Sequence, residues 1–285
     1  MKKINTLLKF VVISLILLSM AACSQPAALE SPDTSAGDSL SGTINLAGST
    51  TIQPLAELLA ETFMDDNPGV QITVQGGGSS VGVKSAAEAT VDIGMASREV
   101  KQEELNEFPQ LVVHVIARDG IAAVAHPEVP VSDLTLEQVR SIFSGEISNW
   151  DQVGGPDQII IVVSREEGSG TRDAFQELVM GKEAMISENA ILQSSNGAVR
   201  TTVATTPFSI GYLSFGYLDD SIKVLSVNGV EAIEINVSNG TYQVVRPLNM
   251  LTNGEPEGAS KAFLDFILSD AGQTLVVSEG YLSVK

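Results

Sequence analysis

The apolar positions from residue 43 onward follow two alternating periods. Short β-branched runs over residues 43–47, 70–75 and 159–163 predict strands, and the third, continuously apolar run is typical of a strand buried on both faces. Between such runs apolar residues recur every three or four positions, as over residues 55–63, which predicts helices with one buried face. This alternation of strand and helix predicts an α/β fold with a mostly parallel sheet.

Three of the predicted strand-to-helix turns are rich in Gly, Ser and Thr. They span residues 48–51, 76–80 and 168–171. Each offers backbone N–H groups, hydroxyls and the positive end of a helix dipole, a combination that suits a small oxyanion. One such turn alone is more often a helix cap than a binding site. Because ligand crevices in open α/β sheets lie at the carboxyl ends of the strands, we expect these turns to form one site.

Two further features extend this candidate site. Arg165 ends a predicted strand just before the third turn, and its planar guanidinium can bind two oxyanion oxygens at once. A fourth polar turn, residues 193–197, precedes another predicted helix and contains Asn196. Both features add hydrogen-bond donors to the same end of the predicted sheet.

Nucleotide-binding and catalytic motifs are incomplete. Residues 77–85 nearly match a P-loop, but Val83 stands where a lysine should follow the second glycine. Ser169 lacks the Gly-x-Ser-x-Gly frame of a nucleophile, since Glu167 and Thr171 occupy the flanking glycine positions. Neither of the two histidines lies in a metal-binding spacing. We therefore predict no catalytic residue, no cofactor and no metal.

The amino terminus has the pattern of an export signal. Three lysines precede the apolar residues 10–22, a stretch too short to span a membrane. Cys23, the only cysteine, follows two alanines and resembles the lipobox of bacterial lipoproteins, which implies a diacylglyceryl anchor. Residues 24–41 are rich in Ser, Pro, Ala and Asp, which predicts a flexible tether. We expect a signal peptide over residues 1–22, a lipidated Cys23 with a tether to residue 41, and a protein anchored at the extracytoplasmic face of the cell membrane.

The mature chain is expected to be strongly acidic. Removal of the signal peptide deletes three lysines and no acidic residue, so the formal charge changes from −19 to −22. Such a chain is not expected to bind nucleic acid, whose phosphates need a basic face. The same charge repels anions at long range, but exposed charges are screened beyond about 8 Å at physiological salt. Local dipoles can therefore still define an anion site.

Six segments, in consistent order, resemble the phosphate-binding proteins that feed the PstSCAB ABC transporter. They are residues 47–51, 76–84, 91–98, 142–150, 164–171 and 210–212. The resemblance implies a type II periplasmic-binding-protein fold, in which two lobes, each a mostly parallel sheet flanked by helices, close on phosphate like a Venus flytrap. It also implies delivery of inorganic phosphate to the permease subunits of an ABC transporter for import. We expect the protein to be a monomer.

The resemblance further implies lobe boundaries and ligand-binding residues. The expected first lobe comprises residues 42–120 and 240–285, and the second comprises residues 121–239. The phosphate-binding residues that the resemblance implies are Thr50, Thr51, Ser79, Arg165, Ser169, Gly170 and Thr171. Ser49 and Ser97 are added as neighbours of these residues, and Asn196 is added because of its polar turn.

One position departs from the family pattern. Several members carry an Asp directly after an Ala-Ser pair, where it accepts the phosphate proton and rejects sulfate, but here Arg98 follows that pair. Either another acceptor supplies the discrimination, or Arg98 attracts the anion and some selectivity is lost. Arg98 could equally be the partner of a nearby acid. Three other functions stay open: a binding protein for sulfate, molybdate or a phosphonate, a secreted phosphatase, and a surface sensor or adhesin.

Overall fold

The computed structural model describes residues 40–182 and 184–285. The expected signal peptide, Cys23 and nearly all of the expected tether lie outside the described residues. Strand β1 (Ser41–Gly48) starts the described chain, so the last residue of the expected tether belongs to a strand. Within the described ranges, no helix has the length and apolarity needed to cross a bilayer.

The first lobe is built on three parallel strands and the helices that follow them. β1 pairs with β2 (Gly69–Gly76) on one side and with β3 (Ile93–Ala96) on the other, both in parallel. Pro54 lies in the first turn of α1, where a helix tolerates proline because the N–H groups there have no partner within the helix. The helices of this lobe are α1 (Gln53–Asp66), α2 (Ser79–Ala87), α3 (Gln102–Glu107), α8 (Gly258–Ile267) and α9 (Asp270–Ser278).

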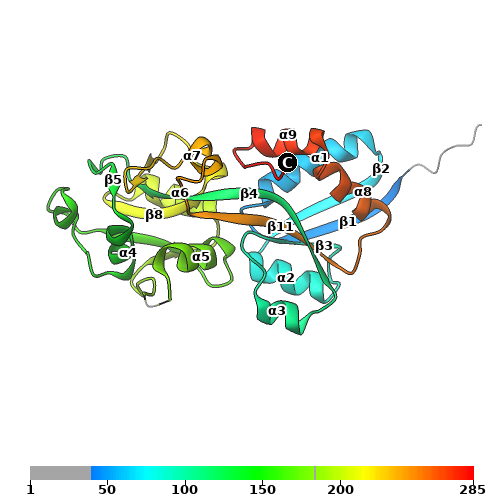
Figure 1. Ribbon diagram of the computed structural model, residues 1–285, viewed down its shortest axis with the longest axis horizontal. Helices are drawn as coiled ribbons and strands as arrows, with labels where there is room; N and C mark the ends of the chain where they lie inside the picture. Colours follow the sequence, from blue (N-terminus) through cyan, green and yellow to red (C-terminus); the bar gives the residue numbers. More distant parts are fainter. Residues whose placement is uncertain (1–39, 183) are drawn as a thin grey trace, which may run out of the picture. The chain divides into compact units, whose positions relative to one another are not determined.

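Two long strands connect the lobes. β4 (Leu111–Ala125) and β11 (Val245–Asn253) pair antiparallel, with Val245 opposite Gly120. β11 also pairs with β3 in the first lobe, whereas β4 pairs from Ile121 onward with β8 of the second lobe. Figure 1 shows both strands running side by side from one group of helices to the other.

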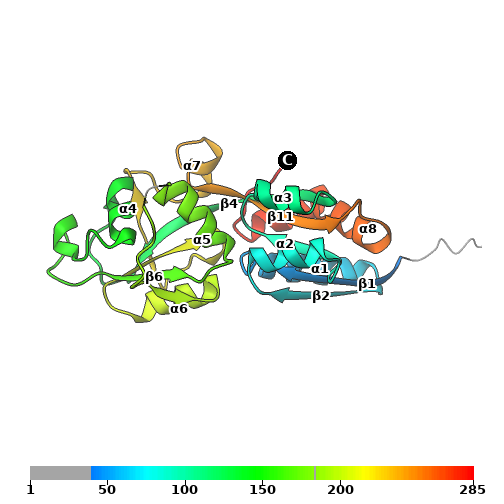
Figure 2. The ribbon, with the colours of Figure 1, turned by 90° about the horizontal axis from the view of Figure 1, so that it is seen from below.

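The second lobe repeats the pattern of parallel strands and helices (Figure 2). β6 (Ile161–Arg165) pairs in parallel with β7 (Ile191–Gln193) and with β8 (Ser209–Ser214). β6 is displaced by two residues from the predicted run over 159–163, and its last residue is Arg165 as expected. The helical elements are α4 (Leu136–Ser144), η1 (Trp150–Val153), α5 (Gly170–Phe175), the π-helix η2 (Gln176–Met180), α6 (Asn196–Thr205), η3 (Phe215–Tyr217) and α7 (Glu234–Ser238).

The strands of both lobes join one nine-stranded sheet in the order β2-β1-β3-β11-β4-β8-β6-β7, with β9 (Lys223–Val224) beside β4. A separate pair joins β5 (Asp133–Leu134) to β10 (Ser226–Val227). The predicted α/β fold class is confirmed. The sheet is antiparallel where the lobes meet, because β4 leaves the first lobe and β11 returns to it in the opposite direction.

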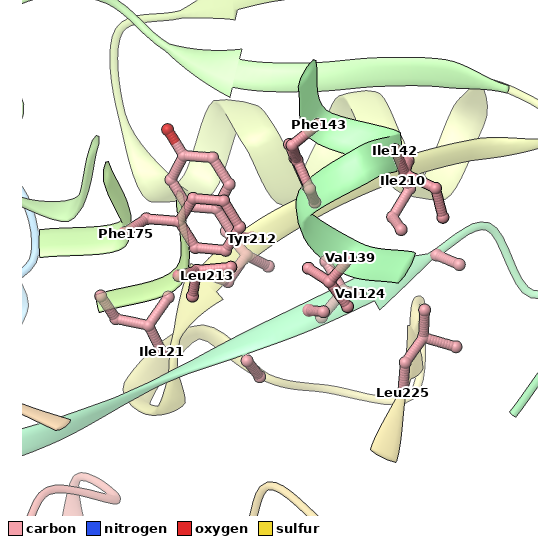
Figure 3. Close-up of a cluster of buried hydrophobic side chains, with 14 of the residues drawn as sticks. Ile121, Val124, Val139, Ile142, Phe143, Phe175, Ile210, Tyr212, Leu213 and Leu225 are labelled. Atoms are coloured by element: carbon pink, nitrogen blue, oxygen red, sulfur yellow. The ribbon is translucent and has the colours of Figure 1, made fainter. Parts of the chain in front are cut away.

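Each lobe has its own apolar core. In the first, Phe63 of α1 packs edge-on against Phe263 of α8, with ring centroids 5.3 Å apart. In the second, the ring of Tyr212 on β8 stacks on Phe175 of α5 at 4.1 Å, and Phe143 of α4 packs edge-on against Phe175 (Figure 3). This stack fixes α5 against the sheet, so it also determines where the amino-terminal end of α5 lies.

Candidate anion-binding site

The three polar turns converge on one small cavity of about 110 Å³. Drug-sized ligands occupy pockets of about 300–1,000 Å³, so this space is too small for a nucleotide. Nine of the ten expected ligand-binding residues line it, together with Gly78. The lining residues are Ser49, Thr50, Thr51, Gly78, Ser79, Ser97, Arg165, Ser169, Gly170 and Thr171.

Helix amino termini bring these residues together. The turns before α1 and α2 and the first turn of α5 all supply lining residues. Ser169 is the N-cap of α5, and its Oγ accepts a hydrogen bond from the Arg172 N–H at 3.3 Å. Gly78, at φ +90°, adopts a backbone conformation that other residues rarely adopt and starts α2 beside the Gly168 carbonyl. Three positive helix ends therefore face one space, which favours an anion there.

Every serine and threonine hydroxyl in the lining accepts a hydrogen bond from an N–H group of the protein, in most cases one behind the lining. The donors are backbone N–H groups for Ser49, Ser79 and Ser169, guanidinium groups for Thr50 and Ser97, and the Asn196 amide for Thr171, while Thr51 accepts from both an amide and a guanidinium. A hydroxyl that accepts from behind can direct its own hydrogen forward. The lining therefore offers hydrogens to the cavity.

Hydrogen bonds across the cavity join the two lobes. The Oγ1 atoms of Thr51 and Thr171 lie 3.1 Å apart, and the Ser80 N–H donates to the Gly168 carbonyl at 3.1 Å. The Tyr217 hydroxyl donates to the Thr50 carbonyl at 2.6 Å. These contacts hold the lining residues of one lobe against those of the other.

Arg165 contributes a buried positive charge. Its side chain is 2 % exposed, Nε donates to the Gln193 carbonyl at 3.0 Å, and Nη2 donates to the Ser194 carbonyl at 2.9 Å and to Thr50 Oγ1 at 3.3 Å. Burial lowers the pKa of Arg165 to about 10, so the guanidinium stays charged at neutral pH. None of the described residues forms an ion pair with it, and a buried charge without a partner is costly. An anion in the cavity would supply that partner.

Asn196 lies behind the cavity and does not line it. Its Nδ2 donates to Thr51 Oγ1 at 2.8 Å and to Thr171 Oγ1 at 3.5 Å, and its Oδ1 accepts from the Ser214 N–H at 3.4 Å. The expected direct contact of Asn196 with a ligand therefore stays a prediction. In the structure its amide orients two hydroxyls that do line the cavity.

Arg98 is paired with acids and lies outside the cavity lining. Its Nη1 and Nη2 donate to the two carboxylate oxygens of Glu104, both at 2.8 Å, and its Nε lies 3.0 Å from Asp173 Oδ2. Partial burial acts to raise the pKa of Glu104, but hydrogen bonds from Arg98 and from the Lys101 N–H lower it overall. Of the alternatives left open above, the structure supports Arg98 as a partner of nearby acids. Among the residues that the structure describes, no carboxylate lines the cavity.

Sequence reasoning missed a buried ion pair next to the site. Asp119 of β4 and Arg246 of β11 are 0 % and 3 % exposed, and Asp119 Oδ2 accepts from Arg246 Nε at 3.0 Å and Nη2 at 2.7 Å. Burial raises the pKa of Asp119, while Arg246, the Ser214 hydroxyl and the Phe215 N–H oppose that rise by stabilising the carboxylate. The sequence feature that could have indicated this ion pair is the presence of Asp119 and Arg246 within two otherwise largely apolar strands.

The two histidines and the possible metal ligands of the described chain lie apart from this cavity. The His114 ring lies 2.9 Å from Thr252 Oγ1, and partial burial lowers the pKa of His114. His126 follows β4 in the second lobe, and neither histidine lines the cavity. Among the described residues, His, Cys, Asp and Glu side chains form no group that could hold a metal ion.

Comparisons with known proteins agree with this geometry. Residues 33–271 match the model of the PBP superfamily domain. The chain is 35% identical over 290 residues to the phosphate-binding protein PstS of Bacillus subtilis (strain 168), with 100% of this chain and 95% of that protein covered. A protein from Clostridium perfringens solved with bound phosphate is similar at a TM-score of 0.82 and 43% identity, covering 86% of this chain and 100% of that chain. An ABC-type phosphate transport receptor from Vibrio cholerae is similar at a TM-score of 0.71 and 34% identity. The match covers 84% of this chain and 99% of that chain.

The length of chain that is matched and the sequence identity together show the family of this protein. The superfamily model matches most of the chain, and the identity to the Bacillus subtilis protein extends over nearly the whole length of both. The chain therefore belongs to the PBP superfamily and, within it, to the family of PstS phosphate-binding proteins.

Proposed function

We propose that this chain captures inorganic phosphate in the cavity, without chemical change, and delivers it to the permease of an ABC transporter for import. The observation that carries the proposal is the buried, charged Arg165 guanidinium, which faces three helix amino termini and a ring of hydroxyl donors. An oxyanion of phosphate size offers acceptors to all of these groups at once. Relatives named as phosphate-binding proteins and phosphate transport receptors support the same ligand.

We further propose that the lobes close over the ligand. The proposed first lobe comprises residues 42–120 and 240–285, and the second comprises residues 121–239. Separate apolar cores and a connection through β4 and β11 support this division, because two strands can bend more easily than a packed core. Tyr242 and Val244 pack in the core of the second lobe, which favours a second crossing nearer to the start of β11 than residue 240.

The proposed setting is the outer face of the cell membrane. Export through the signal peptide and a lipid anchor at Cys23 would hold a monomeric chain beside its permease. The support for this part is the sequence pattern of residues 1–23, together with the transporter role named for the relatives.

Calorimetric titration of the purified mature chain with phosphate, sulfate and molybdate tests the ligand. We expect phosphate to bind in a one-to-one complex and more tightly than the other anions. Tighter binding of sulfate or molybdate would favour a carrier of that anion instead. Hydrolysis of a chromogenic phosphate ester would favour a phosphatase, and no binding of any of these anions would refute the proposed site.

Alanine at Gly170 tests whether the cavity binds the anion. A Cβ at Gly170 would overlap Ser79 Oγ and lie 2.8 Å from Ser97 Oγ, both in the opposite lobe. Since overpacking typically costs about 1–3 kcal/mol, we expect Gly170→Ala to weaken phosphate binding roughly 10- to 100-fold in the same titration. Gly197→Ala is the matched control, because its Cβ would meet only ordinary contacts beginning at 3.7 Å. Equal affinities of the two variants would place the ligand elsewhere.

Asp173→Asn tests the closure of the lobes. Asp173 of α5 lies 3.0 Å from Arg98 Nε and 3.1 Å from Lys101 Nζ, and both cations belong to the first lobe. Because the cluster is partly exposed, we expect phosphate to dissociate a few-fold faster, with a difference of about 1 kcal/mol that shrinks as salt is added. Stopped-flow measurement of dissociation checks this. Asp219→Asn removes a pair with Arg200 inside one lobe and should leave the rate unchanged.

A further inference from the structure

Thr51 is the lining hydroxyl whose hydrogen bonds are most completely determined. Its Oγ1 accepts from Asn196 Nδ2 at 2.8 Å and from Arg246 Nη2 at 3.2 Å. A hydroxyl oxygen has two lone pairs and one hydrogen, so both acceptor positions of Thr51 are filled. The orientation of the Asn196 amide follows from its Oδ1, which accepts from the Ser214 N–H at 3.4 Å. The Thr51 hydroxyl can then only donate, either to Thr171 Oγ1 at 3.1 Å or to a ligand in the cavity.

Arg246 is held in place directly by groups of the first lobe and, through Asp119, by groups of the second. Nε and Nη2 donate to Asp119 Oδ2, and Nη1 donates to the Ser97 carbonyl at 2.9 Å. Asp119 Oδ1 in turn accepts from the Ser214 hydroxyl at 2.9 Å and from the Phe215 N–H at 3.1 Å. Because Asp119 balances its charge, Arg246 adds little net charge to the site. What it supplies is an N–H group at a determined position behind Thr51.

We propose that Arg246 is a positioning residue that determines which protonation state of phosphate binds, because it commits the Thr51 hydroxyl to donating. This proposal rests on the proposed function. Dihydrogen phosphate carries two O–H groups that need acceptors, whereas hydrogen phosphate carries one and offers more acceptor oxygens. Since no described carboxylate lines the cavity and Thr51 cannot accept, the part of the cavity that Thr51 faces favours the dianion. If Arg246 stopped donating, a lone pair of Thr51 would become available to an O–H group of the monoanion.

The titratable groups that face Thr51 and Arg246 come from four elements or their ends. Arg165 of β6 has a pKa of about 10, and burial raises the pKa of Tyr217 in η3 to about 12. Burial also raises the pKa of Tyr281, whose hydroxyl donates to the Thr51 carbonyl at 2.8 Å. None of these three titrates in mildly acidic solution. Asp119 of β4 is the remaining group, and the variants below separate its titration from that of phosphate.

The test compares how phosphate affinity changes with pH in three proteins. In the double variant Asp119→Asn/Arg246→Met both charges are removed together, and the amide oxygen introduced on β4 can still accept from Ser214 and Phe215. Arg246→Lys keeps the charge and Asp119 but lacks the second nitrogen that reaches Thr51. Thermal unfolding confirms that each variant is folded, and Arg246→Lys alone carries the test if the double variant is not.

We expect the wild-type affinity, measured by calorimetry, to fall roughly tenfold between about pH 6 and about pH 5, in proportion to the fraction of dianion. In both variants the fall should be less than about threefold, because the monoanion then finds an acceptor. The same fall in wild type and Arg246→Lys would overturn the proposal, because the hydrogen bond from Arg246 to Thr51 would then not determine which protonation state binds. Failure of the wild type to bind phosphate at either pH would instead refute the proposed function.

Discussion

Arg165→Ala is expected to weaken phosphate binding by at least about 3 kcal/mol, or more than roughly a hundredfold. Hydrogen bonds to charged groups contribute about 1.5–3 kcal/mol each, and a guanidinium can direct two of them at one oxyanion. The substitution also removes the one buried positive charge at the cavity that no described residue neutralises. Isothermal titration with phosphate measures the loss, and circular dichroism shows whether the variant is folded.

Arg200→Ala is the control for that loss. Arg200 is an arginine of the same lobe, but it is partly exposed and pairs with Asp219 at 2.9 Å on the surface. Surface pairs contribute about 0–1 kcal/mol to stability, and this one lies outside the cavity lining, so phosphate affinity should not change. If Arg165→Ala and Arg200→Ala bound phosphate equally well, Arg165 would not be a ligand-binding residue.

Asp119→Ala is expected to lower the free energy of unfolding by about 3–5 kcal/mol, because it leaves the Arg246 guanidinium buried without a counter-charge. The Ser214 hydroxyl and the Phe215 N–H lose their acceptor in the same step. Urea unfolding of the ligand-free protein, monitored by circular dichroism, measures the change.

Asp265→Ala provides the comparison for Asp119. Asp265 pairs with Lys261 one turn away on α8, and both side chains are exposed, so its loss should cost less than about 0.5 kcal/mol. Asp119→Asn should fall between the two, since an amide oxygen can still accept from Ser214 and Phe215. A loss of less than about 1 kcal/mol for Asp119→Ala would show that Arg246 finds another partner or reaches water.

The polar turns could be predicted because each is a local feature. A strand that ends in Gly, Ser and Thr and leads into a helix exposes N–H groups wherever the sequence folds as α/β, and these turns hold seven of the nine expected residues that line the cavity. The exact ends of strands could not be predicted in the same way. The strand predicted over residues 159–163 is β6 at Ile161–Arg165, because hydrogen bonding to β7 and β8 determines which residues belong to the strand.

Arg98 and Asn196 show where local reasoning stops. Arg98 directly follows a lining residue, yet its guanidinium reaches Glu104 of α3 and Asp173 of α5 and stays outside the cavity. Asn196 starts α6 at a polar turn, but its amide lies behind the cavity lining, where it donates to the hydroxyls of Thr51 and Thr171. In both cases the side chain contacts a side chain from another element of the fold. The spacing of residues along the chain does not predict which side chains of separate elements come within hydrogen-bond distance.

The sequence by itself determined that this chain is an α/β protein with several oxyanion-suited turns, and its order of motifs resembled one family of binding proteins. Those properties depend on hydrophobic period and on residues close together in the chain. The tertiary structure alone decided that hydroxyls from both lobes meet in one cavity, and that Asp119 and Arg246 pair behind it. These contacts join residues more than a hundred positions apart, so they exist only once β4 and β11 lie side by side and the lobes pack.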